Sequence, residues 1–373
     1  MIPKKDIVNC KWKPALMAGV WITSCLLLLF LYCLPFHYQQ SPFATALSSG
    51  TQHPVFSHEC YRNSATKIQN NCCRLHKYSL ADIVTCSEGF ANSSAISTPG
   101  NGRRYPGMNN ERDWKTEGLH WVLVGDSRMR QLFTDLAARL SPARALYRVM
   151  DLKSGKWKPS KNLLPLLLGE TGPLHSNAEV YLPDAPLRIT FYWDPVLEYL
   201  PGLLRGWGDT APLPSILVVN SGLHWIVESA EAFATGGRGV AAAPFSRAIS
   251  RLVPELDRLS ADTPVVFQLI DHVQESRNTA KLQQVQSNIN IDYYNDILTK
   301  AVAGTNITLW SSTVCLSDLY IQECTENPYL HDSQKLWMCQ DGVHVGYVMV
   351  IHYVRMLLNF VCNRVLGLGR GFC

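Results

Sequence analysis

Charged residues are scarce in this chain, and beyond four lysines near the N-terminus the basic ones form no cluster. They make up 17% of the 373 residues, and the formal net charge at pH 7 is +4. Four lysines, Lys4, Lys5, Lys11 and Lys13, precede the first apolar run, and the remainder is close to neutral. Because a nucleic-acid-binding domain needs a clustered basic face, the sequence predicts no nucleic-acid partner.

Cysteine patterns typical of zinc sites are missing as well. The chain has no Cys-x-x-Cys pair and no histidine-rich spacing, so we expect no metal site. Of its 12 cysteines, three lie in or before the first apolar run, and nine follow in two clusters. In an oxidising compartment these nine are disulfide candidates, and their odd number leaves one free or paired with another chain. The nine are Cys60, Cys72, Cys73, Cys86, Cys315, Cys324, Cys339, Cys362 and Cys373.

The segment 15–34 contains no charged residue. It is about as long as the ~20 residues that a helix needs to cross a bilayer, whereas a cleaved signal peptide has an apolar core of roughly 7–15 residues. The run ends Tyr-Cys-Leu-Pro-Phe, a poor cleavage site, so an uncleaved signal anchor is favoured over a cleaved signal. No lysine or arginine follows the run before Arg62, and the positive-inside rule therefore predicts a cytosolic N-terminus and a lumenal remainder.

This topology divides the chain into a cytosolic tail (1–14), a transmembrane signal anchor (15–34), a polar lumenal stem (35–58), a cysteine-rich part (59–113) and a main domain (114–373). We expect irregular, disulfide-stapled structure in 59–113, with a loop at 94–105. Two glycosylation sequons, at Asn92 and Asn306, fit a lumenal location. We predict a single-pass type II protein of the Golgi or another secretory-pathway membrane.

From Trp114 onward, short apolar runs alternate with segments of helical spacing, which predicts a mostly parallel sheet covered on both faces. A final helix over 347–362 is favoured over a second membrane span, because its apolar residues form one stripe beside His352, Arg355 and Asn359. The predicted strands are 121–124, 187–192, 215–219, 264–270 and 307–310, and the other predicted helices are 131–139, 243–258 and 283–303.

Two short motifs carry the chemistry. The run Trp121-Val-Leu-Val-Gly-Asp-Ser127 predicts a buried strand, a tight turn and a helix that begins at the serine. The second motif, Asp341-Gly-Val-His344, contains an aspartate and a histidine. A serine, a histidine base and an orienting carboxylate suffice for acyl transfer. The alternative for Asp126 or Ser127 alone is a helix cap.

The run Gly125-Asp-Ser-Arg-Met-Arg-Gln-Leu-Phe133 resembles the first conserved block of the SGNH (GDSL-type) hydrolases, and more narrowly the PC-esterase group. That group includes sialate O-acetyltransferase and the trichome-birefringence-like polysaccharide O-acetyltransferases. The Asp341-x-x-His344 block and the segment from Cys73 to Cys86 are also similar to this group. The resemblance spans 73–346, but matching residues are frequent only near its two ends. It implies an SGNH-like three-layer α/β/α fold.

The resemblance also implies roles for individual residues. Ser127 would be the nucleophile, His344 its base, and Asp341 the residue that orients the imidazole. The backbone N–H of Ser127, on the turn that Gly125 permits, would form the oxyanion hole with either Gly222 or the Asn220 side chain. The order Asn220-Ser-Gly222 departs from the family pattern, so that choice stays open. Arg130 would order the site or bind an anionic substrate group, or it is a solvated helix arginine.

Five other residues are weaker candidates. His224 could line the cleft, although a strand-end histidine with a structural role is favoured. Tyr192 and Trp193 could stack on a sugar, or serve as core packing. Asp271-His272 has the residue types of a catalytic dyad. Side chains of adjacent residues in an extended strand point to opposite faces of the sheet, however, so the two are not expected to serve one site.

These observations lead to three hypotheses. The first is a lumenal O-acetyltransferase that acts on hydroxyls of a glycan or glycoconjugate through a Ser-His-Asp acyl-enzyme. It binds no resident cofactor but needs an acetyl donor, such as acetyl-CoA supplied across the membrane by a membrane partner. The second is a carbohydrate or lipid esterase with the same triad, and the third is a non-catalytic glycan-binding or accessory protein.

Overall fold

In the computed structural model, the described residues are 53, 56–60, 72–96, 119–151, 155–160, 175–207, 211–327, 336–369 and 371–372, with only the backbone described at 58 and over 90–96. The predicted tail and anchor, and most of the predicted stem, lie outside these residues. Within the described part of the chain, no helix is both long and apolar enough to cross a membrane.

The described residues form one eight-stranded sheet in the order β3-β2-β4-β5-β1-β6-β7-β8. Strands β5, β1, β6, β7 and β8 are parallel neighbours, and β4, β2 and β3 extend the sheet antiparallel. The predicted mostly parallel sheet is therefore confirmed. The bounds are β1 Leu119–Gly125, β2 Leu146–Asp151, β3 Lys156–Ser160, β4 Ala178–Leu182, β5 Leu187–Trp193, β6 Ile216–Asn220, β7 Val265–Gln268 and β8 Thr308–Trp310.

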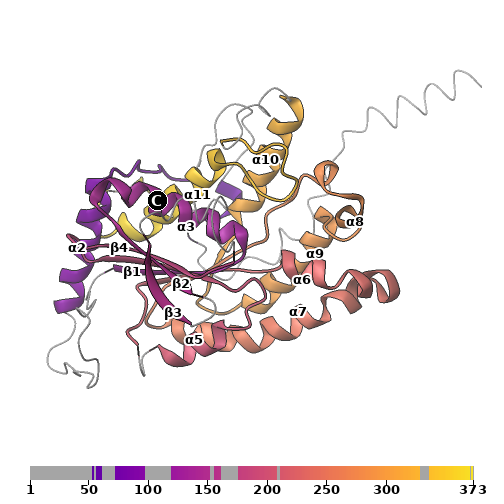
Figure 1. Cartoon of the computed structure of the whole chain (residues 1–373), viewed down its shortest axis with the longest axis horizontal. Coiled ribbons are helices and arrows are strands. Elements are labelled where there is room, and N and C mark those ends of the chain that lie inside the picture. Colours follow the sequence, from indigo (N-terminus) through magenta and orange to yellow (C-terminus); the bar gives the residue numbers. More distant parts are fainter. Residues whose placement is uncertain are drawn as a thin grey trace, which may run out of the picture. The chain divides into compact units, whose positions relative to one another are not determined.

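Helices lie on both faces of this sheet (Figure 1). Along β1, Leu119, Trp121 and Leu123 belong to a core cluster that also contains buried residues of α2, α3 and α11. The opposite face is covered by α5 and α7, and α7 contacts β7 there. The bounds are α2 Leu80–Ile96, α3 Ser127–Leu140, α5 Leu200–Gly206, α6 Leu223–Glu228, α7 Ala230–Ser260, α8 Ala280–Gln283, α9 Asn288–Val302, α10 Ser312–Glu326 and α11 Tyr347–Cys362, with short 3-10 turns η2 His58–Cys60, η3 Ser141–Ala143 and η4 Glu275–Arg277.

Three helical predictions need correction. The region predicted to be irregular contains α2, whose Ile83 and Cys86 are buried in the core. The predicted helix 283–303 is divided into α8 and α9, because the Ser287 side chain caps α9 by accepting from the Asn290 N–H. Helix α7 begins 13 residues before the predicted start at 243, but it is kinked at Gly237, whose φ of 73° is not helical. The final helix, 347–362, is confirmed.

One of the described disulfides connects the two cysteine clusters of the sequence. Cys86 of α2 is bonded to Cys362 of α11, and Cys60–Cys72 and Cys324–Cys339 close shorter loops. Cys73 is also disulfide-bonded. Among the described cysteines Cys315 is free, in agreement with the odd count.

Candidate active site

The turn between β1 and α3 presents Ser127 at the carboxyl edge of the parallel strands. A Cβ atom on Gly125 would lie 2.5 Å from the Asn220 carbonyl oxygen, so this close approach of β1 to β6 requires glycine. Asp126 caps α3 by accepting from the Arg128 N–H at 2.9 Å. Because Asp126 takes the cap role, the hydroxyl of Ser127 remains available for another partner.

That partner is His344. Its Nε2 lies 2.7 Å from Ser127 Oγ, and its Nδ1 lies 2.8 Å from Asp341 Oδ2. The other carboxylate oxygen of Asp341 accepts the backbone N–H groups of Val343 and His344 at 2.8 and 2.9 Å. The structure thus places the three residues predicted as nucleophile, base and orienting carboxylate in one hydrogen-bonded chain, which is the geometry required for general-base activation of a serine.

The electrostatics of Asp341 suit the orienting role. Burial acts to raise the pKa of its carboxyl, but the hydrogen bonds and charge of His344 and the two backbone N–H groups lower it to about 2. Asp341 is therefore ionised at neutral and mildly acidic pH. An ionised carboxylate at Nδ1 fixes the tautomer in which Nε2 accepts the serine proton.

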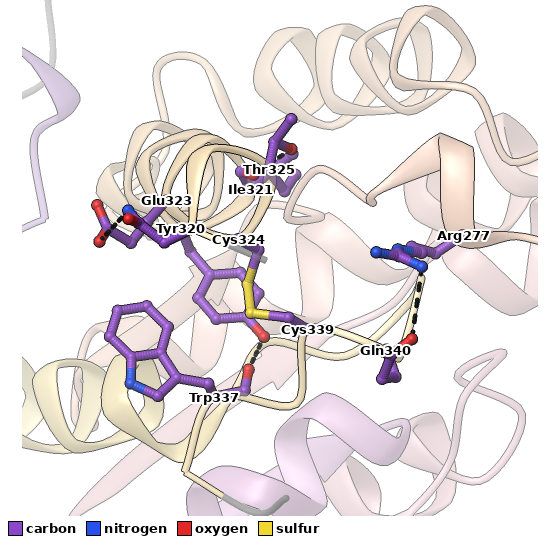
Figure 2. The surroundings of a disulfide bond; sticks show 10 residues. Arg277, Tyr320, Ile321, Glu323, Cys324, Thr325, Trp337, Cys339 and Gln340 are labelled. Atoms are coloured by element: carbon purple, nitrogen blue, oxygen red, sulfur yellow. Dashed lines mark hydrogen bonds between the residues drawn. A yellow bond between two sulfur atoms is a disulfide. The ribbon is translucent and has the colours of Figure 1, made fainter. Parts of the chain in front are cut away.

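The segment that carries Asp341 and His344 is anchored next to the disulfide Cys324–Cys339 (Figure 2). In that view the Tyr320 hydroxyl donates to the Trp337 carbonyl, and Arg277 Nη1 donates to Gln340 Oε1 at 3.4 Å. The loop after β7 adds a further bond, from the Gln274 N–H to the Gly342 carbonyl at 2.9 Å. Two segments, helix α10 and the stretch 274–277 after β7, therefore hold the chain around Asp341.

Two backbone N–H groups, predicted from the sequence as oxyanion donors, have no acceptor in the described structure. They are those of Ser127 and Gly222. The Asn220 side chain is 2% exposed, and its amide nitrogen faces the carbonyls of Gln268 and Leu269 at 3.3 and 3.5 Å. Since Asn220 is already engaged, the geometry favours Gly222 in the choice that the sequence left open. The catalytic role of either residue stays a prediction.

Basic side chains surround an indole beside this turn. Trp193 pairs with Gly125 in the sheet register, and the Asp194 N–H donates to the Gly125 carbonyl at 3.0 Å. The guanidinium of Arg130 lies 5.5 Å from the Trp193 ring centroid, and the rings of His175 and His224 lie 4.3 and 5.7 Å from it.

Burial, and then the charges of Arg130 and His224, lower the pKa of His175. The His175 ring is stacked on the indole, with 13° between the two planes. Arg130, Trp193 and His224 are candidates from the sequence. His175 is not, because it belongs to no motif and precedes β4, a strand that was not predicted.

Asp271 and His272 lie outside the triad and have separate partners. Asp271 is 1% exposed and its carboxylate is 3.9 Å from Arg128. His272 is bonded to Asp318 at 2.5 Å and to Asp292 at 2.9 Å. The prediction that the pair does not serve one site is consistent with this arrangement.

The two predicted sequons are also placed. Asn92 lies within α2, and Asn306 is exposed just before β8. Over the described stretches of the chain, no three metal-binding side chains are grouped closely enough to hold an ion.

No protein-family model matches the chain. Two solved structures similar to it are an alpha/beta hydrolase enzyme from the metagenome of Lake Arreo, Spain, and a peptidoglycan O-acetylesterase. The first is 14% identical with a TM-score of 0.38, covering 65% of this chain and 94% of that one. The second is 10% identical with a TM-score of 0.41, covering 67% and 92%. These values are too low to carry a reaction or a substrate over to this chain, and the resemblance to the PC-esterase group stays a prediction.

Proposed function

We propose that the chain is a serine-dependent O-acetyltransferase that acts on glycan hydroxyls. The observation that carries the proposal is the continuous chain Ser127–His344–Asp341. Ser127 Oγ attacks the acetyl carbonyl of the donor while His344 Nε2 takes its proton, and the tetrahedral oxyanion is stabilised by the N–H groups of Ser127 and Gly222. Collapse expels the donor's leaving group, which receives the proton from His344, and leaves an acetyl ester on Ser127.

The second half of the reaction reverses these roles. A sugar hydroxyl attacks the acetyl-enzyme, His344 takes its proton, and Ser127 leaves with that proton restored. The Trp193 indole lies next to Gly125, with the His175 ring stacked on it and the Arg130 guanidinium beside it. This apolar ring surface bordered by hydrogen-bond donors supports a sugar as the acceptor.

The compartment is part of the proposal. The disulfides of the described residues support an oxidising location, and the apolar segment 15–34 supports a Golgi or other secretory-pathway membrane with the main domain in the lumen. The donor chemistry that fits is an activated acetyl ester such as acetyl-CoA. A membrane partner that delivers acetyl groups would overcome the barrier to this charged, cytosolic molecule.

A second candidate, ester hydrolysis, is favoured by the exposure of the triad. The side chains of His344 and Asp341 are 26% and 33% exposed, so water can reach the base. If water competes successfully with the sugar for the acetyl-enzyme, the same residues act as a carbohydrate or lipid esterase.

The test uses the purified full chain, and as matched controls Ser127→Ala and the surface variant Ser250→Ala. Fluorophosphonate labelling is expected in wild type and Ser250→Ala and absent in Ser127→Ala. Incubation with an acetyl donor and a glycan is expected to yield acetylated glycan. Release of acetate without glycan acetylation would establish the esterase and reject the transferase, and a folded wild type without labelling would favour the non-catalytic alternative.

A further inference from the structure

The backbone on both sides of His344 is held by one helix. The carbonyl oxygen of Val343 accepts from Nη2 and Nε of Arg128 at 2.5 and 3.2 Å. The carbonyl oxygen of Val345 accepts from Nε2 of Gln131 at 3.0 Å. Both donors belong to α3, the helix that begins with Ser127. The peptide group just before His344 and the carbonyl of the residue just after it are therefore tied to the element that carries the nucleophile.

Arg128 also fixes the helix to a third segment. Its Nη1 donates to the Asp271 carbonyl at 2.6 Å and its Nη2 to the His272 carbonyl at 3.3 Å, both in the loop after β7. The guanidinium is almost fully buried, with 3% of its side chain exposed. A buried cation needs a compensating charge, and the buried carboxylate of Asp271 lies 3.9 Å away. This arrangement leaves the guanidinium little freedom to move.

The spacing along α3 explains why one helix can make all these contacts. Ser127 and Gln131 are four residues apart and so share a face, with Arg128 on the adjoining side. The segment from Asp341 to Val345 can therefore lie along the first turn of α3, with His344 opposite Ser127. A shift of Val343 or Val345 would move the imidazole relative to Ser127 Oγ, and a misplacement of ~1 Å at a reacting group can cost about 100-fold in rate.

We infer that Arg128 and Gln131 are positioning residues that hold His344 in register with Ser127, which rests on the proposed serine chemistry. Neither side chain needs to touch the substrate. Their effect on the reaction comes through the carbonyl oxygens of Val343 and Val345. From the sequence motif, Arg130 was instead the arginine predicted to order the site.

Two substitutions test this inference in the full chain. Arg128→Lys keeps the positive charge. A single ammonium group, however, cannot make all the hydrogen bonds by which the planar guanidinium reaches both the His344 segment and the loop after β7. Gln131→Met nearly preserves the volume and removes the donor to Val345. It leaves the Val345 carbonyl without its donor, at a cost of about 1–3 kcal/mol, but it also removes the buried Oε1 of Gln131, which has no hydrogen-bond partner and whose loss offsets part of that cost. Arg139→Lys is the matched control, because Arg139 lies on the same helix and pairs with Asp135 at 2.7 Å.

Two readouts are measured on each variant. The first is turnover of p-nitrophenyl acetate, where we expect kcat to fall by about 10- to 100-fold in both variants while KM stays within about two-fold. The second is hydrogen exchange of peptides covering 339–346, where we expect faster exchange than in wild type. Arg139→Lys should match wild type in both.

Each outcome decides the inference. Unchanged exchange, or faster exchange with wild-type kcat, would overturn it. If Arg128→Lys does not fold, Gln131→Met alone decides. If wild type neither turns over the ester nor labels at Ser127, the proposed function fails. The exchange measurement then still decides whether the two donors hold the His344 segment, since faster exchange confined to 339–346 supports that contact and unchanged exchange excludes it.

Discussion

His344 Nε2 and Ser127 Oγ lie 2.7 Å apart although 217 residues separate them in the sequence. The contact joins the first turn of α3 to the segment just before α11, and these two helices pack against each other. Most of the chain between the two residues completes the sheet and the helices of its opposite face. The proposed active site therefore requires the whole sheet to be in place, and it cannot form from either motif alone.

The first prediction concerns the triad. Ser127→Ala should abolish labelling by a fluorophosphonate, and Asp341→Asn should lower kcat by about 10⁴-fold, because the imidazole then takes the wrong tautomer. The measurement is turnover of p-nitrophenyl acetate together with labelling, with Ser250→Ala as control. Activity of Asp341→Asn close to wild type would show that His344 does not depend on this carboxylate.

The second prediction concerns pH and His272. Burial lowers the pKa of this imidazole, but the hydrogen bonds and charges of Asp292 and Asp318 outweigh burial and raise the pKa to about 9. Because the pKa is higher in the folded state than in the unfolded state, protonation of His272 stabilises the folded protein. This contribution is complete at pH values below the unfolded-state pKa of about 6.5, and it is lost as the pH rises through 9. Both carboxylates are about half exposed, so solvent screening limits the effect to the order of 2 kcal/mol.

The measurement is the denaturation midpoint of wild type and His272→Gln between pH 6 and pH 10. Wild type should lose stability across the window from about 6.5 to 9, and the variant should be nearly flat there. His352→Gln is a suitable control, because burial and then the charge of Arg355 lower the pKa of His352, which places its titration below this window. An equal slope in wild type and His272→Gln would contradict the prediction.

The third prediction concerns the disulfide that ends two residues before Asp341. Replacing Cys324 and Cys339 together by alanine should destabilise the fold by about 2–4 kcal/mol and also lower kcat, since the anchor of the catalytic segment is lost. Replacing Cys60 and Cys72, a loop of similar length, should reduce stability with a smaller effect on kcat per folded molecule. Equal effects of the two pairs on kcat would mean that Cys339 does not position the site.

The sequence identifies those parts of the fold whose pattern is local. Each of the five parallel strands is a short apolar run, because both faces of that part of the sheet are covered by helices. The strands that were missed have a different environment. In β2 every residue is exposed or half-buried, and β4 carries Glu179, bonded to Arg148 of β2. Pairing at such an edge depends on the neighbouring strand, which a linear pattern does not reveal.

The same distinction holds for the candidate site. Ser127, Asp341 and His344 are found because each sits in a short motif. The contacts of Arg128 and Gln131 are not found, because their acceptors are carbonyl oxygens, which every residue possesses. Helix α2 was missed because its Asn, Ser and Gly residues are typical of loops, whereas its Cys86 is fixed by a disulfide to α11.

The last prediction separates a glycan substrate from a small ester. Trp193 lies beside Gly125 in the sheet and is contacted by Arg130 and His175. If a sugar packs against this indole, Trp193→Leu should raise KM for an acetylated glycan by about 10-fold, in keeping with a loss of 1–2 kcal/mol of ring contact. Turnover of p-nitrophenyl acetate, which has no sugar, should change little.

The control is Trp157→Leu, because Trp157 also carries a cation–π contact, from Arg148, but lies on the edge strand β3. It should leave both substrates unaffected. Were Trp193→Leu to impair the small ester and the glycan equally, Trp193 would support the catalytic turn around Gly125 rather than the acceptor. The acceptor subsite would then have to lie elsewhere along the carboxyl edge of the sheet.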